Sequence, residues 1–224
     1  MALLSEANQD KLRQDFSAMP RRVKLLFFTQ TFGCDTCTQA RQILDALAGT
    51  TDKVVVEDAN VVLEPEKAKG YGIDRAPSIV VLGIDEQGAD LDYGIRFLGT
   101  PSGYEFVSLV EAVRLAGGIA PTLSDTSLRR LAAIDRPVTI RVFTTPTCAY
   151  CPAAVGLAYE MAVASPLVTA IAVEAAEFPD LAARYRVTGV PKTVVDDTVE
   201  ILGALPEEDF VAQALDHLAS PEHG

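Results

Sequence analysis

Apolar residues along the first half of the chain alternate between short runs and helical spacings. The unbroken run from Val23 to Phe28 is typical of a strand that is buried on both faces. Apolar residues three and four positions apart after residue 40 instead predict an amphipathic helix that ends at Gly49. On these grounds we expect helices over 5–19, 40–48, 64–71 and 106–116, and strands over 23–28, 54–56, 78–82 and 94–98.

The second half repeats this order of elements. We expect helices over 123–134, 154–163 and 179–185 and a last one from Pro206, with strands over 138–143, 168–173, 191–195 and 199–202. Alternating strands and helices of this kind predict an α/β fold in which each half is a central mixed β-sheet flanked by helices. The Gly117–Pro121 stretch is the best boundary, so we expect one unit over 1–118 and a second over 119–224.

An internal repeat supports the two units. The chain has four cysteines, and they form two Cys-x-x-Cys pairs, Cys34–Cys37 and Cys148–Cys151. The pairs are 114 positions apart (148 − 34), and so are Pro77 and Pro191 (191 − 77), which follow the pairs in apolar surroundings. A constant offset across separate landmarks indicates two related units in tandem.

Composition narrows the range of functions. The net charge of −12 and the isoelectric point near 4.6 argue against a nucleic-acid or anionic-membrane surface, since both need a basic footprint. No apolar run approaches the roughly 18 residues of a spanning helix, and the first residues lack the pattern of a secretory signal. We therefore expect a cytosolic protein. In that reducing compartment, close Cys-x-x-Cys pairs are more often catalytic or metal-binding than structural.

The expected elements suit each pair to redox chemistry. A strand ends just before the pair, and a helix is expected to begin at its first cysteine. Backbone N–H groups at a helix start favour a thiolate, which lowers the thiol pKa from about 8.5. The second cysteine lies one turn further on the same face, where it can attack a mixed disulfide formed by the first.

The two pairs differ in their surroundings. Around Cys148, Pro146 shapes the approach and Pro152 suits a first helical turn. In the first pair, Asp35 lies between the cysteines and disfavours a neighbouring thiolate by charge repulsion. We expect Cys34 to be less acidic than Cys148 and its disulfide to be less oxidising.

These features together resemble a known family. The opening helix and the stretches 71–77, 96–106 and 142–152 are similar to the glutaredoxin-like protein disulfide oxidoreductases known mainly from thermophiles, which join two thioredoxin-fold units. The resemblance implies that Pro77 and Pro191 are cis-prolines facing the two dithiols. It also implies that the preceding residues, Ala76 and Val190, offer backbone groups to an extended client peptide, as in β-strand addition.

The resemblance further implies a carboxylate behind each dithiol that takes a proton from the second sulfur. Glu174 fits this role in the second unit. The position 114 residues before Glu174 is Asn60, which is not an acid. If the alignment of the two repeats shifts locally, Asp58 or its neighbour Glu57 would serve in the first unit. Proton transfer at the first pair is therefore the less well supported of the two.

The function that we expect is thiol–disulfide exchange. The pairs Cys34–Cys37 and Cys148–Cys151 would cycle between dithiol and disulfide and would exchange electrons with client proteins, by reduction, oxidation or isomerisation. No bound cofactor and no metal are expected. The resemblance implies an NADPH-dependent flavoprotein of the thioredoxin reductase type as the source of electrons.

Other functions stay open at this point. The nearest alternative is a dedicated electron carrier for a peroxiredoxin-type peroxidase, similar to the paired thioredoxin-fold segment of alkyl hydroperoxide reductase flavoproteins. A structural module with one four-cysteine zinc site is a further alternative, although zinc ribbons separate their pairs by only about 15 to 20 residues. Cys34 and Cys37 could also form an inert structural bridge.

Overall fold

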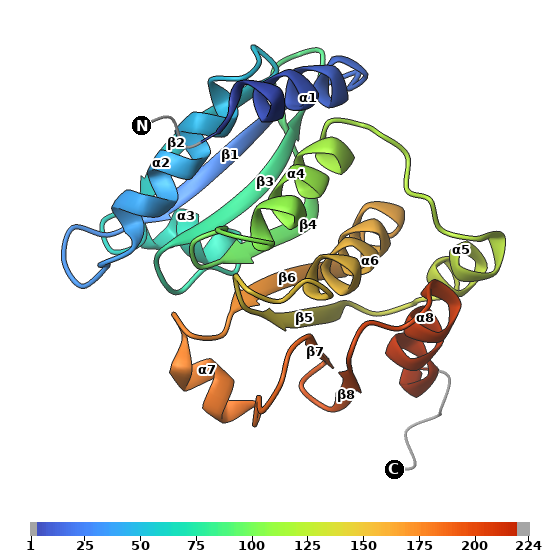
Figure 1. The fold of residues 1–224 in the computed structure, drawn as a ribbon. Coiled ribbons are helices and arrows are strands. Elements are labelled where there is room, and N and C mark those ends of the chain that lie inside the picture. Colours follow the sequence, from blue (N-terminus) through green and yellow to red (C-terminus); the bar gives the residue numbers. More distant parts are fainter. Residues whose placement is uncertain (1–3, 219–224) are drawn as a thin grey trace.

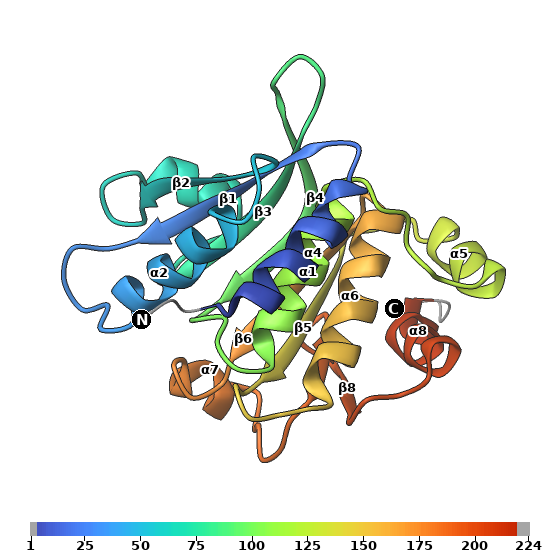
Figure 2. The same cartoon turned by 45° about the horizontal axis from the view of Figure 1, so that its top comes forward.

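One continuous sheet organises the molecule. The structure, a computed structural model, describes residues 4–218, and its eight strands follow the order β2-β1-β3-β4-β6-β5-β7-β8. Figures 1 and 2 show the strands in a single twisted layer, with the first half of the chain on one side and the second half on the other. The first four strands in this order come from one half and the last four from the other, in equivalent sequence.

The expected helices and strands are present in both halves. The first half contains α1 (Glu6–Ser17), β1 (Arg22–Thr29), α2 (Cys37–Ala48), β2 (Val54–Asn60), α3 (Pro65–Gly70), β3 (Ser78–Ile84), β4 (Asp90–Leu98) and α4 (Glu105–Ala116). The second half contains α5 (Asp125–Ala132), β5 (Val138–Thr144), α6 (Cys151–Ala164), β6 (Val168–Glu174), α7 (Pro179–Arg184), β7 (Lys192–Val195), β8 (Val199–Leu202) and α8 (Glu207–Leu215), followed by a short 3-10 helix, Asp216–Leu218. Strand β2 continues four residues beyond the expected 54–56.

Apolar side chains on the two faces of the sheet form two cores. In β1, Leu25 and Phe27 point to a large core under α1, α2, α4 and α6, while Leu26 and Phe28 point to a smaller core under α3 and α7. This alternation explains why β1 is a continuous apolar run, because both of its faces are covered. Each core contains residues of both halves, so neither half has a core of its own.

The two sheets that the sequence predicts are joined edge to edge. Strand β4 pairs in parallel with β6, from Ile95 opposite Ala170 to Leu98 opposite Val173. Each half keeps a mixed four-stranded arrangement, so the predicted fold class is confirmed. The pairing of β4 with β6 is an addition that periodicity could not predict, because it joins strands more than 70 residues apart.

The direction of the strands gathers the functional loops at one edge. Strands β1, β2, β4, β5 and β6 all run in the same direction, since β1 and β4 both pair antiparallel with β3 and the other contacts are parallel. The carboxyl ends of these strands therefore meet at one edge of the sheet, which we call the redox edge. The loops that carry both Cys-x-x-Cys pairs leave from it.

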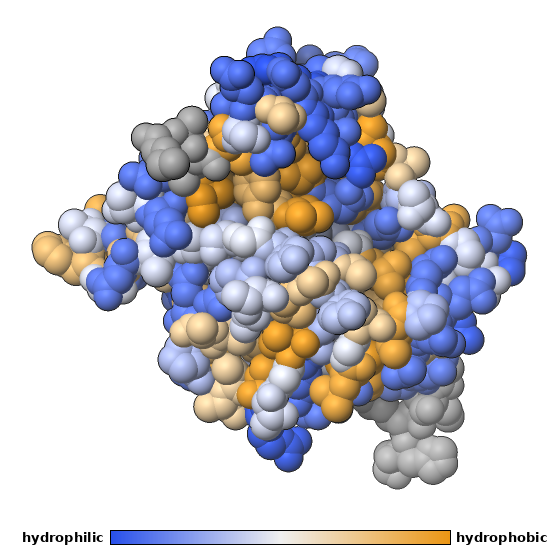
Figure 3. Space-filling model, in the orientation of Figure 1, coloured by the Kyte–Doolittle hydropathy of each residue, from blue (hydrophilic) through white to orange (hydrophobic). Residues whose placement is uncertain are grey.

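The helical face of the first half has a shallow hydrophobic groove between α1 and α4. Its lining combines the polar side chains of Asn8, Lys11 and Asp15 with the apolar ones of Leu4, Leu12, Phe106, Val107 and Val110. Figure 3 shows hydrophobic surface exposed among hydrophilic side chains on this face of the molecule. Within residues 4–218, no helix has the length and apolar character needed to cross a bilayer.

Candidate functional site

The second Cys-x-x-Cys pair lies where β5 ends and α6 begins. Cys148 and Cys151 form a disulfide, with Cys148 half-buried and Cys151 fully buried. Helix α6 starts at Cys151, so the expectation that the helix begins at the first cysteine was wrong by one turn. The consequence for the sulfur is nevertheless the expected one, because the Cys151 N–H donates a hydrogen bond to Cys148 Sγ at 3.1 Å. A donor in this position stabilises a thiolate on Cys148.

The first pair is built in the same way but, among the described residues, without the hydrogen bond to its first sulfur. Cys34 and Cys37 form a disulfide, and α2 begins at Cys37. Cys34 is half-buried and Cys37 is buried, and a cavity of about 390 Å³ opens beside them. Among residues 4–218, we find no hydrogen bond to Cys34 Sγ that matches the one on Cys148. The nucleophile of the second pair is therefore the better stabilised.

Both prolines that follow the pairs are preceded by a cis peptide bond, Ala76–Pro77 and Val190–Pro191. The cis geometry that the resemblance implies is thus confirmed. The register places each proline at the redox edge, because Phe28 of β1 lies opposite Ser78 and Phe143 of β5 lies opposite Lys192. Each cis-proline therefore lies beside the strand that leads into its Cys-x-x-Cys loop.

Glu174 lies at the end of β6, directly beside the end of β5. It is 2% exposed and pairs with Thr144 in the strand register. Its carboxylate accepts hydrogen bonds from the N–H groups of Ala176 and Glu177. Burial raises the pKa of Glu174 above its ordinary value, so this carboxyl binds a proton more readily than an exposed one.

A second buried carboxyl, Glu105, comes from the other half of the chain. It is the first residue of α4, is 1% exposed and accepts a hydrogen bond from the Thr144 hydroxyl through Oε1. Burial raises the pKa of Glu105 to about 8, and the negative charge of Glu174 contributes in the same direction. Among the described residues its Oε2 atom has no hydrogen-bond partner.

Glu105 lies beside the end of β5, the strand that leads into the second redox loop, because it contacts Thr144. Helices α4 and α6 pack side by side, and both begin at the redox edge, α4 with Glu105 and α6 with Cys151. The sequence interpretation did not identify this residue. Glu105 falls within the 96–106 stretch that carries the family resemblance, and an acid at a helix start is common enough that only its burial distinguishes it.

The first pair has no equivalent buried carboxyl among the described residues. Asn60 occupies the place of Glu174, since its Oδ1 accepts the N–H groups two and three residues further on, as the Glu174 carboxylate does. Asp58 lines the cavity beside Cys34 and Cys37, but its side chain is 55% exposed and paired with Arg41. Hydrogen bonds from Lys67 and Lys24 hold the pKa of Glu57 below its ordinary value, which makes Glu57 a weak proton acceptor.

Residues of the first half also hold the second redox loop in place. The Tyr104 N–H donates to the Pro146 carbonyl at 2.9 Å, and Gly103 approaches the same carbonyl so closely that a Cβ would lie 2.3 Å from its oxygen. Gly99 packs against Glu174 in a similar way, with a φ of +112° and only 2.6 Å between a built Cβ and the Glu174 Cβ. Glycine is therefore required at both positions.

The two disulfides are separate centres. Four strand-to-strand steps lie between β1 and β5, which at about 4.8 Å each separates the two loops by about 19 Å. All four ligands of a zinc ion lie about 2.3 Å from the metal. This spacing excludes the alternative of one four-cysteine zinc site, and it also prevents direct exchange between the two pairs within one molecule.

Comparison with known proteins agrees with this geometry. Residues 138–216 match the thioredoxin domain family. The chain is 28% identical over 183 residues to the AhpF protein of the alkyl hydroperoxide reductase of Pseudomonas aeruginosa, which covers 80% of this chain and 32% of that protein. The chain thus spans about a third of the length of the curated relatives that it matches.

Two solved structures share the whole arrangement. The N-terminal domain of the alkyl hydroperoxide reductase AhpF of Enterococcus faecalis superposes with a TM-score of 0.85 at 28% identity, over 95% of this chain and 99% of that one. A protein disulfide oxidoreductase from Aeropyrum pernix superposes with a TM-score of 0.81 at 26% identity, over 95% and 93% of the two chains. The tandem thioredoxin-like architecture, with a Cys-x-x-Cys pair in each half, is therefore established for this chain.

Proposed function

We propose that this chain, a thiol–disulfide oxidoreductase of the thioredoxin fold, acts on protein disulfides mainly through Cys148. The hydrogen bond from the Cys151 N–H to Cys148 Sγ is the observation that carries this proposal. It stabilises negative charge on the half-buried sulfur, while the partner sulfur is fully buried. A client disulfide can reach the first sulfur but not the second.

The reaction then proceeds in two exchanges. The Cys148 thiolate attacks one sulfur of a client disulfide, forms a mixed disulfide and releases the other client sulfur, which takes up a proton. Cys151 next loses its proton and attacks Cys148 Sγ, which releases the second client thiol and leaves the Cys148–Cys151 disulfide. Two electrons pass from the enzyme dithiol to the client, and the reverse sequence oxidises a client dithiol.

We assign the proton from Cys151 to the two buried carboxyls behind it. Glu174 and Glu105 both have raised pKa values, and the pKa of about 8 for Glu105 is close to that of a thiol. Proton transfer between groups of similar pKa costs little free energy in either direction. The Oε2 atom of Glu105 has no hydrogen-bond partner among the described residues, which supports it as an acceptor.

Client binding is assigned to the backbone before the cis-prolines. At the second site, Val190 and Pro191 lie at the redox edge beside the loop of Cys148, and Ala76 and Pro77 hold the equivalent place at the first site. An extended client segment could pair with these backbones as an added strand. The exposed ring of Tyr150, between the two cysteines, supplies an apolar contact for such a segment.

The first pair is proposed to perform the same exchange with lower reactivity. Cys34 lacks the stabilising hydrogen bond of Cys148, and Asp35 places a negative charge beside it. Asp58 is the carboxylate in the same cavity and is our candidate for its proton acceptor. Its exposure and its pairing with Arg41 make this acceptor weaker than Glu174.

The electron source is proposed to be an NADPH-dependent flavoprotein reductase. The similarity to a component of alkyl hydroperoxide reductase supports a reductase as the partner of this chain. Because the chain spans about a third of that relative, the reductase would be a further domain or a separate protein. A reducing compartment such as the cytosol would keep both pairs cycling.

A second candidate function is electron delivery to a peroxidase of the peroxiredoxin type. The specific observation in its favour is the superposition on 99% of the N-terminal domain of the Enterococcus reductase. A reconstituted assay distinguishes the two functions. If a peroxiredoxin oxidises the reduced protein much faster than insulin or scrambled ribonuclease does, the carrier function is favoured.

Cysteine variants test the assignment of the principal nucleophile. We expect Cys148→Ser to remove most insulin reduction by the full chain, because the stabilised thiolate is lost. Cys34→Ser should remove less than half of it. Equal losses, or a larger loss from Cys34→Ser, would show that the two sites are ranked wrongly.

A trapping variant tests the role of Cys151. In Cys151→Ser the mixed disulfide between Cys148 and a client cannot be resolved, so non-reducing electrophoresis should reveal a covalent adduct. The additional replacement of Cys148 by serine is the matched control and should abolish that adduct. An adduct that survives in the control would mean that another cysteine attacks the client.

A further inference from the structure

The segment 175–180, which follows β6 and includes the first two residues of α7, reaches across the molecule to the first redox site. It belongs to the second half, yet it contacts Thr36, Thr100 and Arg75 of the first half. Thr36 lies between Cys34 and Cys37. The geometry points to Glu177 of this segment as a positioning residue for the first dithiol, supplied by the opposite half of the chain.

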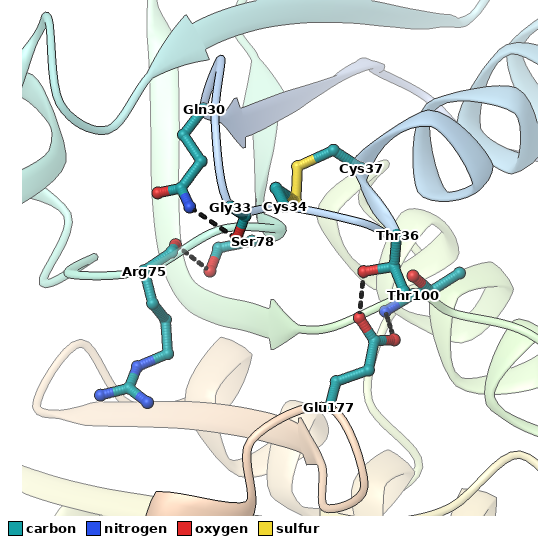
Figure 4. Close-up of a disulfide and its surroundings, with 9 residues drawn as sticks. All are labelled: Gln30, Gly33, Cys34, Thr36, Cys37, Arg75, Ser78, Thr100 and Glu177. Carbon is teal, nitrogen blue, oxygen red and sulfur yellow. Dashed lines mark hydrogen bonds between the residues drawn. A yellow bond between two sulfur atoms is a disulfide. The ribbon is translucent and has the colours of Figure 1, made fainter.

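Glu177 holds the first redox loop with both of its oxygens. The Thr36 hydroxyl donates to Glu177 Oε2 at 2.5 Å, and the Thr100 N–H donates to Oε1 at 2.7 Å. Figure 4 shows the carboxylate rising from the second half toward the loop that carries the disulfide. Thr36 is the N-cap of α2, and its side chain makes no cap hydrogen bond, because its hydroxyl is turned toward Glu177.

The segment itself is anchored on both sides of Glu177. The Glu177 N–H donates to the buried Glu174 carboxylate. Further along, Asp180 forms an ion pair with Arg75 at 3.0 Å, and the Arg75 guanidinium lies over the ring of Phe178. Arg75 is two residues before the cis-proline of the first site. The position of Glu177 is therefore fixed relative to both redox loops.

This contact has no counterpart at the second site within the described residues. The repeat offset of 114 relates Glu177 to Leu63 and Thr36 to Tyr150, and these two side chains are 76% and 75% exposed. The difference follows from the topology, because β2 is the outermost strand and β6 lies at the junction of the halves. The loop after β6 can therefore reach the redox loop of the other half, whereas the equivalent loop after β2 cannot.

The Glu177 carboxylate adds negative charge close to the first dithiol. The other charged groups around this dithiol are Asp35, Arg41, Asp58 and Arg75, and the two arginines are already paired with carboxylates. A further carboxylate disfavours a thiolate on Cys34. This inference rests on the proposed function, in which the first pair is redox-active, and it identifies what sets its reactivity.

The test measures the thiol pKa of Cys34 in the full chain. Cys148→Ser and Cys151→Ser are combined so that only the first pair reacts, and the rate of iodoacetamide alkylation of Cys34 is followed from pH 5 to 10. With Glu177→Gln added, we expect the apparent pKa to fall by about half a unit and alkylation at pH 6 to be about three times faster. Glutamine keeps the size of the side chain and an acceptor for the Thr100 N–H, so a purely structural role would leave the profile unchanged.

Glu160→Gln is the matched control. In the wild type, the Glu160 carboxylate also accepts hydrogen bonds from a threonine hydroxyl and a backbone N–H, both of Thr122. It contacts neither redox loop. An identical Cys34 profile with Glu177→Gln and with Glu160→Gln would overturn the inference. Failure of the chemically reduced Cys34–Cys37 pair to be reoxidised by a client disulfide in this background would instead contradict the proposed role of the first site. The alkylation profile of the reduced protein would still decide the role of Glu177.

Discussion

Two buried carboxyls at the junction of the halves have the most unusual properties among the individual residues. Glu105 and Glu174 come from different halves, both lie beside Thr144 at the end of β5, and both have raised pKa values. With a pKa of about 8, the Glu105 carboxyl is mostly protonated at neutral pH. That state suits a group that must accept and return a proton during each cycle. It also has a consequence for stability.

Glu105 should destabilise the fold as the pH rises. Its pKa is about 8 in the folded protein against an ordinary 4.5, so the folded state binds the proton more tightly than the unfolded state. The stability associated with this proton is present below pH 4.5 and is lost as the pH rises through 8. We expect Glu105→Gln to be more stable than the wild type at pH 9, by up to about 5 kcal/mol, and nearly equal at about pH 4.5.

Urea unfolding of the oxidised proteins at about pH 4.5, 7 and 9 measures this difference. Glu207→Gln serves as a control of opposite sign, because hydrogen bonds from Ser127 and Ser124 lower the pKa of Glu207. A lowered pKa contributes stability above the ordinary pKa, so this variant should lose stability at about pH 7 and above and little at about pH 3. A gap between wild type and Glu105→Gln that does not grow with pH would contradict the account.

At the scale of elements, helix α6 connects the two halves. It carries Cys151 at its start, packs beside α4 and joins β4 through Tyr159, whose hydroxyl donates to the Arg96 carbonyl at 2.9 Å. Tyr159 is fully buried, and burial raises its pKa well above the ordinary 10, so it stays a donor at all working pH values. The position of α6 is therefore set by both halves.

Removing this hydrogen bond should weaken the junction without changing the sulfur chemistry. We expect Tyr159→Phe to lower the free energy of unfolding by about 1–2 kcal/mol, since a buried carbonyl loses its partner. Tyr93→Phe is the matched control, because the Tyr93 hydroxyl accepts a hydrogen bond from the Arg21 guanidinium at an exposed site and should contribute less than about 0.5 kcal/mol. Equal effects of the two variants in urea unfolding would contradict a junction role for Tyr159.

At the scale of the whole molecule, the chain is one folding unit built from two repeats. The boundary that we propose at 118/119 divides the sequence, but β4 pairs with β6 and both cores contain residues of each half. Separating the halves would expose the β4 edge and much of the core. We infer that neither half is stable without the other.

Unfolding should therefore be a single cooperative transition. In the reduced protein, the buried Cys37 and Cys151 should become accessible to a thiol reagent at the same urea concentration, which should coincide with the loss of the far-ultraviolet dichroism signal. Peptide mapping after pulsed labelling measures each cysteine separately. Two transitions separated in urea concentration would mean that the halves unfold independently.

The sequence predicted what local pattern and repetition encode. The elements followed from apolar spacing, the offset of 114 led to two related units that each carry a redox pair, and the family resemblance implied both cis-prolines. What could not be predicted depends on contacts between distant residues. The pairing of β4 with β6, the burial of Glu105 and the contact of Thr36 with Glu177, 141 residues apart, exist only once the two sheets are joined. Both helices also begin at the second cysteine of their pair, one turn after the first, a boundary that apolar spacing does not fix.

The most direct test of the account is a redox titration of the full chain with each pair measured separately. The protein is equilibrated in thiol–disulfide buffers of known potential and quenched with an alkylating reagent, and the peptides of each pair are then quantified by mass. We predict two independent two-electron transitions, both between about −300 and −120 mV, with the Cys148–Cys151 pair at the higher potential. A Cys148–Cys151 pair that stays oxidised well below about −300 mV would behave as a structural disulfide and would contradict the account.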